Sequence, residues 1–309
     1  MDKTDLLALC RVKSVSWTFI AREAQRPGGL ERLMSGTASE EGDEARKSLT
    51  LLAEARLEMT KHREDIRRML ESTDADGYRL TTVLDDDYPV NLRLIYNLPP
   101  FLFYRGELRP DDAYSVAVVG TREPSPDGLA RAHRMAAELA RAGVTVLSGL
   151  ARGIDAAAHE GCLEAGGRTL AILGSGIRRI YPDEHHDLAD RIAASGAVVS
   201  QFWPDTAPTS YTFPRRNVVT SGMGQGTVVV EASATSGAKM QARLAIEHGK
   251  QVFLLKSLVT QRDWAKRYLK RPRVREVAGV EDILKALRSP NELFERARDQ
   301  RAQLALALD

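Results

Sequence analysis

Two glycine-containing stretches carry the residue types that could bind a phosphate group. The runs Gly120-Thr-Arg122 and Ser148-Gly-Leu-Ala-Arg-Gly-Ile-Asp155 each follow a short apolar segment. A glycine lets the backbone approach an anion closely, an arginine can bind phosphate oxygens in a bidentate manner, and a helix N-terminus adds partial positive charge. Neither run is a dinucleotide fingerprint or a P-loop. The residues predicted to bind an anion here are Arg122, Gly149, Arg152 and Gly153.

A third stretch, Phe213-Pro-Arg-Arg-Asn217, places an aromatic ring beside two cations and an amide. A ring that stacks on bases, flanked by arginines that bind phosphates, is the physical design of a single-strand binding site. An alternative for Arg216 is a structural role at the start of a helix. The residues predicted to contact DNA here are Phe213, Arg215, Arg216 and Asn217.

Two further runs are expected at the same edge of the protein as the first three, where strands of a sheet end. They are Gly224-Gln-Gly-Thr-Val-Val-Val-Glu231 and Ser236-Gly-Ala-Lys239. The helix expected to start near Lys239 offers its N-terminus to an anion, and we predict that Lys239 binds DNA. Glu231 either holds a ribose hydroxyl, as in a nucleotide-binding relative, or accepts backbone N–H groups.

Evidence for catalysis is weak in this sequence. Asp155 and His159 lie four residues apart, on one face of the expected helix, and Ser148 is the nearest nucleophile. The alternative is a buried structural network of Arg152, Asp155 and His159. His185-His186 has no partners at metal-ligand spacing and is interpreted as surface. We therefore predict no catalytic residue, no metal and no cofactor.

Basic residues with two aromatic neighbours dominate the segment Gln261–Arg275. We expect this segment to extend a positive track for DNA, and the alternative is a solvated or interaction surface. The residues of this predicted secondary basic patch are Lys266, Arg267, Lys270, Arg271 and Arg273.

The elements that position these residues repeat a strand–glycine–helix unit. Near-continuous Val/Ile/Leu runs predict strands that are buried on both faces, and right-handed crossovers then give a doubly wound, mostly parallel sheet. The fold class is α/β, an extended Rossmann-like domain with a small helical module before it. The expected strands of the main domain are 115–119, 144–147, 169–173, 197–202, 227–231 and 251–255.

Three regions follow from this pattern: a helical module at 1–72, the Rossmann-like domain at 73–288 and an amphipathic helix at 289–309. A long polar helix is predicted from about Asp43 to Glu71. The Pro27-Gly-Gly29 break before it is consistent with a helix-hairpin-helix that touches the DNA backbone, or with a packing or partner module.

Composition excludes several function classes. The 309 residues contain 44 Lys and Arg against 42 Asp and Glu, so that any polyanion site must be a local patch. The two cysteines are too few for a disulfide framework or a structural zinc site. We expect a cytoplasmic protein that has no contact with membranes, because no apolar run reaches about 18 residues and the first residues are unlike a signal peptide.

Ordered motifs across roughly residues 78–256 resemble the DprA/Smf family of DNA-processing proteins. The resemblance implies an extended Rossmann fold, single-stranded DNA binding, a homodimer and loading of a RecA-type recombinase. It also implies Arg122 as a phosphate ligand and Phe213 as a stacking residue in one pocket with Arg215–Asn217. The motifs are Val119-Gly-Thr-Arg122, Ser148–His159, Gly174-Ser-Gly176 with Tyr181-Pro182, Phe213–Asn217, Val230-Glu-Ala232 and Ser236-Gly237.

Departures from the family pattern begin after the strand at 251–255, where Lys256-Ser257 stands in place of a Pro-Gly turn. Gln241-Ala242 replaces a usual Thr-Ala, and we expect no winged-helix domain in the remaining residues. A specialised relative with a partner protein in phage defence is therefore a second possibility beside DNA uptake.

The alternative function is a nucleotide-binding sensor or an N-glycosidic nucleotide hydrolase of the same superfamily, with Glu231 as the catalytic carboxylate. Its signature is similar to Gly224–Glu231, but Met223 stands where a glycine belongs and Glu231 falls one residue late. We favour a non-catalytic single-stranded DNA-binding protein.

Overall fold

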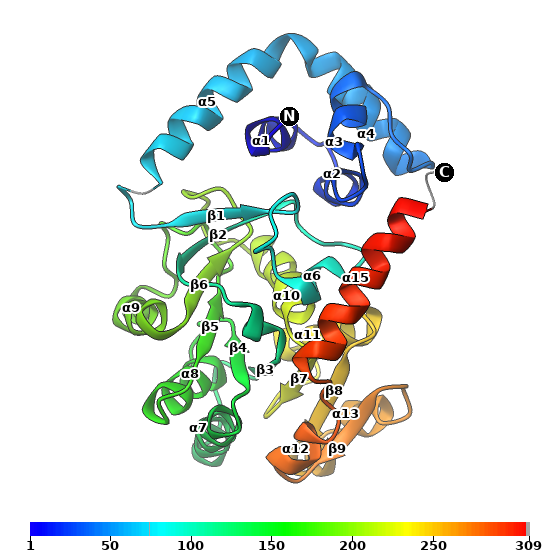
Figure 1. Ribbon diagram of the computed structural model, residues 1–309. Helices are drawn as coiled ribbons and strands as arrows, with labels where there is room; N and C mark the ends of the chain where they lie inside the picture. The colour runs from blue at the N-terminus through cyan, green and yellow to red at the C-terminus, as the bar shows by residue number, and fades with distance from the viewer. Residues whose placement is uncertain (74, 307–309) are drawn as a thin grey trace.

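The computed structural model describes residues 1–73 and 75–306, and its first part is helical, as the sequence predicts (Figure 1). The predicted helix over 43–71 is broken, because α4 contacts α2 while α5 packs on α1, and Leu57 between them is 96% exposed. The elements are α1 (Lys3–Arg11), α2 (Trp17–Ala24), α3 (Gly29–Ser35), α4 (Asp43–Glu54), η1 (Ala55–Glu58) and α5 (Met59–Ser72).

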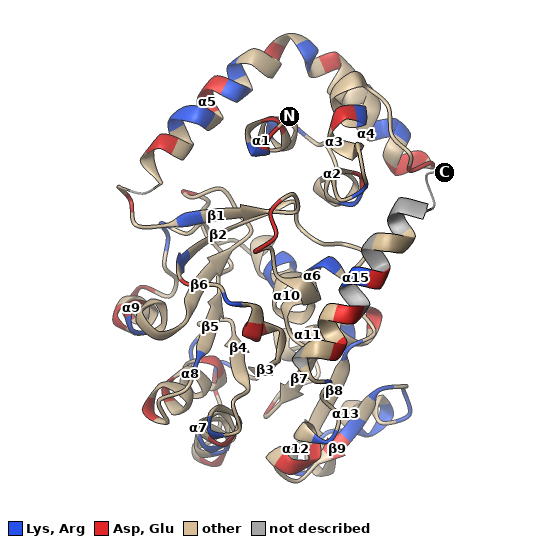
Figure 2. Cartoon of the chain, viewed as in Figure 1, with Lys and Arg blue, Asp and Glu red and all other residues tan. Residues whose placement is uncertain are grey.

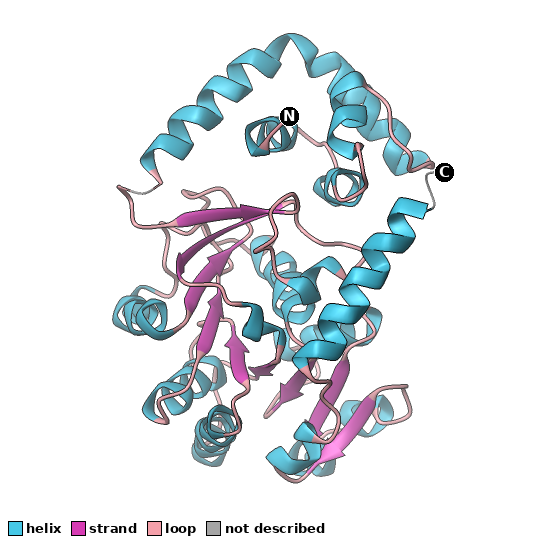
Figure 3. Ribbon diagram, viewed as in Figure 1, coloured by secondary structure: helices cyan, strands magenta, loops and turns pink. Residues whose placement is uncertain are grey.

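A nine-stranded sheet forms the main body, in the order β1-β2-β6-β5-β4-β3-β7-β8-β9 (Figure 3). The pairs β1–β2 and β2–β6 are antiparallel, and the other six pairs are parallel. The strands are β1 (Arg79–Thr82), β2 (Phe101–Gly106), β3 (Ser115–Val119), β4 (Thr145–Ser148), β5 (Thr169–Ile172), β6 (Ala197–Ser200), β7 (Gly226–Val229), β8 (Gln251–Leu255) and β9 (Val274–Val277).

Helices cover both faces of this sheet (Figure 1). The chain steps from β3 to β6 in one direction through α7, α8 and α9, then returns to the other side of β3 through α10. The order of strands therefore reverses at β3, where doubly wound proteins bind ligands. The helices are α6 (Val90–Arg93), η2 (Pro110–Ala113), α7 (Pro126–Arg141), α8 (Ile154–Glu164), η3 (Asp183–His185), α9 (His186–Ser195), α10 (Thr212–Met223), α11 (Gly237–Glu247), α12 (Lys256–Gln261), α13 (Asp263–Tyr268), α14 (Val280–Leu284) and α15 (Pro290–Leu306).

Alternate residues of β3 belong to two different cores. Val116 and Val118 pack in a cluster with residues of α7 and α8, whereas Ala117 and Val119 join a larger cluster with residues of α10, α11 and the N-terminal helices. This division follows from the two-residue period of a strand, and it confirms the predicted burial of both faces.

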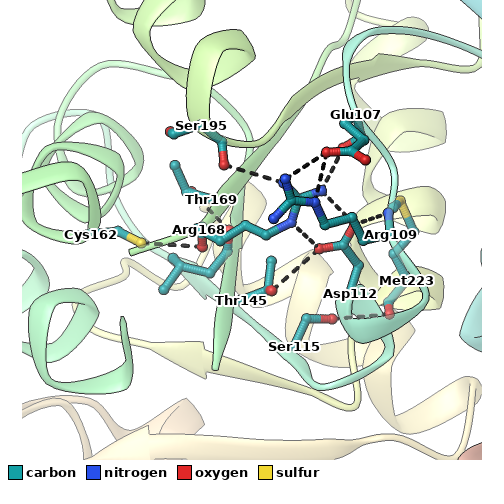
Figure 4. Close-up of polar contacts among 11 residues, drawn as sticks. Glu107, Arg109, Asp112, Ser115, Thr145, Cys162, Arg168, Thr169, Ser195 and Met223 are labelled. Carbon is teal, nitrogen blue, oxygen red and sulfur yellow. Dashed lines mark hydrogen bonds and ion pairs between the residues drawn. The ribbon is translucent and has the colours of Figure 1, made fainter. Parts of the chain in front are cut away.

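Opposite the carboxyl ends of the strands, Arg168 binds the segment that precedes β3 (Figure 4). Its Nε donates to Asp112 Oδ1 at 2.6 Å, and its Nη2 donates to Asp112 Oδ2 at 2.9 Å and to the Glu107 carbonyl. The Asp112 carboxylate also accepts from the Arg109 N–H and the Thr145 hydroxyl. This largely buried ion pair joins β5 to η2 at the amino ends of the strands.

In the described part of the chain, no helix is long and apolar enough to cross a membrane. Cys10 and Cys162 are buried and free. The terminal helix α15 begins at Pro290, within the predicted segment 289–309, whose last three residues lie outside the described residues.

Candidate functional site

A cleft of about 430 Å³ opens at the carboxyl ends of β3, β4 and β7, where the strand order reverses. We refer to it as the cleft. The cleft brings together residues of the predicted runs at 120–122, 148–155, 213–217 and 236–239. Its principal lining residues are Gly120, Thr121, Arg122, Gly149, Asp155, Phe213, Arg216, Asn217, Ser236 and Gly237.

Arg122 and Phe213 meet at the mouth of the cleft. The Arg122 guanidinium lies 5.0 Å from the centre of the half-buried Phe213 ring, and Arg122 forms no ion pair with any described residue. The centre of the Tyr181 ring lies 5.8 Å from that of the Phe213 ring. A cation stacked on an aromatic ring, with a second ring beside it, can bind a phosphate and a base at once.

Gly174, which follows β5, makes room for the Phe213 ring. A Cβ atom at Gly174 would lie 2.5 Å from the ring, which is too close for any other residue without a shift of Phe213. The position of the aromatic ring is therefore fixed by the loop after β5 as well as by α10.

Arg216 lies in the wall of the cleft, but its guanidinium forms hydrogen bonds inside the protein. Its side chain is buried, with 8% exposed, and Nη1 donates to the carbonyls of Gly149 at 2.6 Å and Ile172 at 2.9 Å. A Cβ at Gly149 would overlap this guanidinium. The geometry favours the structural alternative for Arg216, which joins the loop after β4 and the last residue of β5 to α10.

The predicted network of Arg152, Asp155 and His159 does not form among the described residues. Asp155 accepts a hydrogen bond from the Gly149 N–H at 3.1 Å, and burial raises the pKa of its carboxyl while Arg216 opposes that shift. His159 Nδ1 contacts Thr169 Oγ1 at 2.7 Å inside the fold. Arg152 instead pairs with Glu184 at the surface, where it lowers the pKa of that carboxyl to about 2.

Glu231 takes the second of its two predicted roles. Its carboxylate accepts from the Ser125 N–H at 3.2 Å and from the Ser125 hydroxyl at 2.9 Å. Ser125 in turn caps α7, with Pro126 at the first helical position, as predicted. Ser148 donates its hydroxyl to the Val118 carbonyl and is buried. Glu231 thus binds the residue that caps α7, and Ser148 forms its hydrogen bond inside the sheet.

The N-terminus of α11 points at the cleft through Ser236, Gly237 and Ala238, which line it. Ser236 caps this helix by accepting from the Lys239 N–H, and the first turn of a helix is a region of partial positive charge that favours an anion. The Lys239 ammonium does not line the cleft. It donates to the Ala234 carbonyl at 2.9 Å and lies 6.0 Å from the centre of the Trp264 ring.

The sequence model of a family described as DNA recombination-mediator protein A matches residues 79–288, which include the whole sheet and every wall of the cleft. The chain belongs to this family.

Relatives of the family align with this chain over most of the same region. It is 39% identical over 194 residues to the protein Smf of Escherichia coli, which is 61% of this chain and 52% of that protein. It is 34% identical over 187 residues to the DNA processing protein DprA of Bacillus subtilis, covering 60% of this chain and 63% of the relative. The chain thus spans about half to two thirds of the length of these relatives.

Solved structures of family members share the fold. The DprA of Streptococcus pneumoniae superposes with a TM-score of 0.74 and 26% identity, covering 94% of this chain and 99% of that one. The DprA of Helicobacter pylori, whose structure describes a single-stranded DNA binding mode, superposes with a TM-score of 0.59 and 24% identity over 71% of this chain and 96% of that one. The expected DprA/Smf membership and the Rossmann-like fold are thereby confirmed.

Within this family fold, the predicted site residues divide into two groups. Arg122, Gly149, Phe213 and Asn217 converge on the cleft, and Arg152 lies beside Phe213 and Tyr181 in a small adjoining depression. Arg215 lines a different hollow, on another face of α10. Sequence reasoning did not include Tyr181 among the site residues, although the Tyr181-Pro182 pair belongs to the motifs that carry the family resemblance.

The predicted basic patch lies on α13 and in the segment after it, where Figure 2 shows Lys and Arg residues, and none of its residues lines the cleft. Lys266 and Arg267 are on α13, and Lys270 and Arg271 follow it. Trp264 of α13 donates its indole N–H to the Ala232 carbonyl, in the loop that leads to Ser233 and Ser236 of the cleft. The patch is therefore joined to the cleft rim through the loop after β7.

Proposed function

We propose that this protein binds single-stranded DNA in the cleft with little sequence preference. The observation that carries the proposal is the Arg122–Phe213 pair at the switch point of the sheet. Phosphates would contact Arg122 and the N-terminus of α11, and a base would stack on Phe213 and Tyr181. None of these contacts reads the edge of a base, so that one base would serve almost as well as another.

Family membership supports this proposal independently of the cleft. Relatives of this chain are described as DNA processing proteins, and the Helicobacter pylori member is described as binding single-stranded DNA. The anion-binding groups of this chain occupy the ligand edge of the same fold. We propose a corresponding role in DNA processing and recombination.

The role we propose is non-enzymatic. The nucleotide hydrolase alternative needs Glu231 as a free catalytic carboxylate, and Glu231 is held by both the N–H and the hydroxyl of Ser125. Among the described residues, no group of three His, Cys, Asp or Glu side chains could hold a metal ion. Nothing in the cleft geometry favours bond cleavage over binding.

Titration of labelled oligo-dT into wild type, Arg122→Glu and Phe213→Ala tests the proposal. Loss of a stacking ring costs about 1–3 kcal/mol per base, so that we expect Phe213→Ala to weaken binding by about tenfold or more, and Arg122→Glu at least as much. The matched control is Arg134→Glu, an exposed residue of α7 with the same charge change. Unchanged affinity in both cleft variants would falsify the proposal.

The alternative is tested on the same samples. Nucleotide turnover by wild type that disappears in Glu231→Gln would support a hydrolase and count against a purely binding role. Dimerisation, loading of a RecA-type recombinase, and a role in DNA uptake or phage defence stay predictions from the family resemblance. Light scattering and co-purification with a recombinase would test the first two.

A further inference from the structure

A second hollow of about 640 Å³ lies between the N-terminal helices and α10, and we refer to it as the groove. Its walls are the turn between α1 and α2 and one face of α10. The charged and aromatic lining residues of the groove are Arg11, Lys13, Trp17, Tyr211 and Arg215.

The groove repeats the chemistry of the cleft with different residues. The Arg215 guanidinium lies 5.3 Å from the centres of both the Trp17 and the Tyr211 rings, and its Nη1 donates to the Tyr211 hydroxyl at 3.0 Å. The Tyr211 side chain is 67% exposed, an unusual position for a large ring in a folded protein. Trp17 is half-buried, so that Tyr211 is the exposed ring of the pair. An exposed ring beside a cation favours a stacked base with a flanking phosphate.

Unpaired positive charge gathers in the groove. Among the described residues, Arg11, Lys13 and Arg215 form no ion pair, and no lining residue of the groove is acidic. By contrast, Arg22 pairs with two glutamates and Arg63 with Asp5 elsewhere in the same helical module. Asp65, which is not a lining residue, acts electrostatically on Arg11. A lining that holds three cations without ion pairs and no carboxylate is suited to a polyanion.

Cleft and groove lie on two faces of one helix. Tyr211, at the start of α10, and Arg215 line the groove, whereas Phe213 and Asn217 line the cleft. Each pair is four residues apart, and such residues share a face. Because a helix is about 10 Å across, a strand that leaves the cleft over the start of α10 reaches the groove within a few nucleotides.

We infer that the groove is a second segment of the single-stranded DNA site, which binds the nucleotides that continue out of the cleft. This inference rests on the proposed function. The N-terminal helical module then contacts DNA through the α1–α2 turn, where Ser14 has a left-handed backbone (φ 64°) and Arg11 stacks on Trp203 at 4.0 Å. The Pro27-Gly-Gly29 break considered for this purpose in the sequence is not part of the groove.

Oligo-dT of two lengths separates the two segments. A strand of about three nucleotides is too short to leave the cleft for the groove, and one of about twenty reaches both. We expect Tyr211→Ala and Lys13→Glu to leave the affinity for the short strand unchanged and to weaken the long strand by about tenfold. Tyr211→Phe should retain the affinity for the long strand, and Lys47→Glu on exposed α4 is the matched charge control.

The outcomes are distinguishable. If wild type binds neither length, the proposed function fails. If Arg122→Glu weakens both lengths while the groove variants change neither, the groove inference alone is overturned. Equal losses for short and long strands in the groove variants would also overturn it, because the groove would then not be a separate segment. Unchanged melting temperatures exclude unfolding as the cause.

Discussion

Two arginines of the cleft show how burial decides the role of a side chain. Arg122 is exposed and stacks on Phe213, so that its guanidinium can bind a phosphate. Arg216 is buried and bound to two backbone carbonyls, so that DNA would have to displace internal hydrogen bonds to reach it. We therefore expect Arg216 substitutions to act through the shape of the cleft, and Arg122 substitutions to act directly on DNA.

His159 makes the stability of the protein dependent on pH. Burial lowers the pKa of this histidine to about 3 in the folded state, against an ordinary value of 6.5. Below about pH 6.5 the unfolded state binds a proton that the folded state does not, and the free energy of unfolding falls by about 1.4 kcal/mol per pH unit. We expect His159→Gln to reduce this dependence in urea unfolding between about pH 7 and 5.

The exposed His186 provides the control for this measurement. His186→Gln should retain the pH dependence of wild type. Burial also lowers the pKa of His248, to about 4. His248 therefore adds a pH dependence of the same sign to wild type and to both variants. A pH dependence in His159→Gln equal to that of wild type would contradict the interpretation.

At the scale of elements, the ion pair of Arg168 and Asp112 connects the start of β5 to η2, at the amino ends of the strands. Removing one partner of a buried pair costs about 3–5 kcal/mol, because the other charge stays buried without its partner. We expect Asp112→Ala to lower the free energy of unfolding by about that amount and to leave oligo-dT affinity unchanged, since the cleft lies at the opposite edge.

The surface pair of Arg191 and Glu160 is the matched control. Glu160→Ala should cost about 0–1 kcal/mol, as for exposed pairs in general. Both values come from urea titrations at one pH. Equal losses in the two variants would show that the pair at Asp112 is no stronger than one at the surface.

At the scale of the whole molecule, the formal net charge is only +2, so that the proposed DNA binding must depend on local patches of positive charge. The basic patch on α13 is one of these (Figure 2). Reversing Lys266, Arg267 and Lys270 should reduce the slope of log affinity against log salt by about 2, since each phosphate contact contributes about 0.7 for single strands.

Reversal of Arg46, Lys47 and Arg56, three exposed cations of the N-terminal helices, gives the same change in net charge. It should leave the salt dependence as in wild type. Lys266 and Arg46 each have an exposed aspartate partner, so that the two variants lose comparable surface pairs. A slope that stays at the wild-type value in the α13 variant would show that the patch does not contact DNA phosphates. The patch would then be a solvated surface or an interaction surface.

Sequence predicted those parts of the molecule that depend on local pattern. The strands 115–119 and 251–255 have the predicted bounds, because each is a continuous apolar run. The sequence does not predict the break at Ala55–Glu58. The helices on its two sides pack against different helices of the module, and no glycine or proline marks the break.

Contacts between distant parts of the chain could not be predicted from sequence. Arg215 and Arg216 are adjacent in sequence, yet one faces the groove and the other the backbone of two strand ends. Only the packing of α10 against the sheet and the N-terminal helices separates these roles. The convergence of Arg122 and Phe213 was predicted through the family resemblance and is present in the cleft.

The hydrogen bonds of Arg216 to the loop after β4 and to the end of β5 have a kinetic consequence. Loops that are already tied before a ligand arrives lose little conformational entropy when it binds. The rate of association is then set by encounter, which free surface cations accelerate, and not by a slow rearrangement of the protein. In the proposed binding of single-stranded DNA, Arg216 would therefore speed association without contacting the strand.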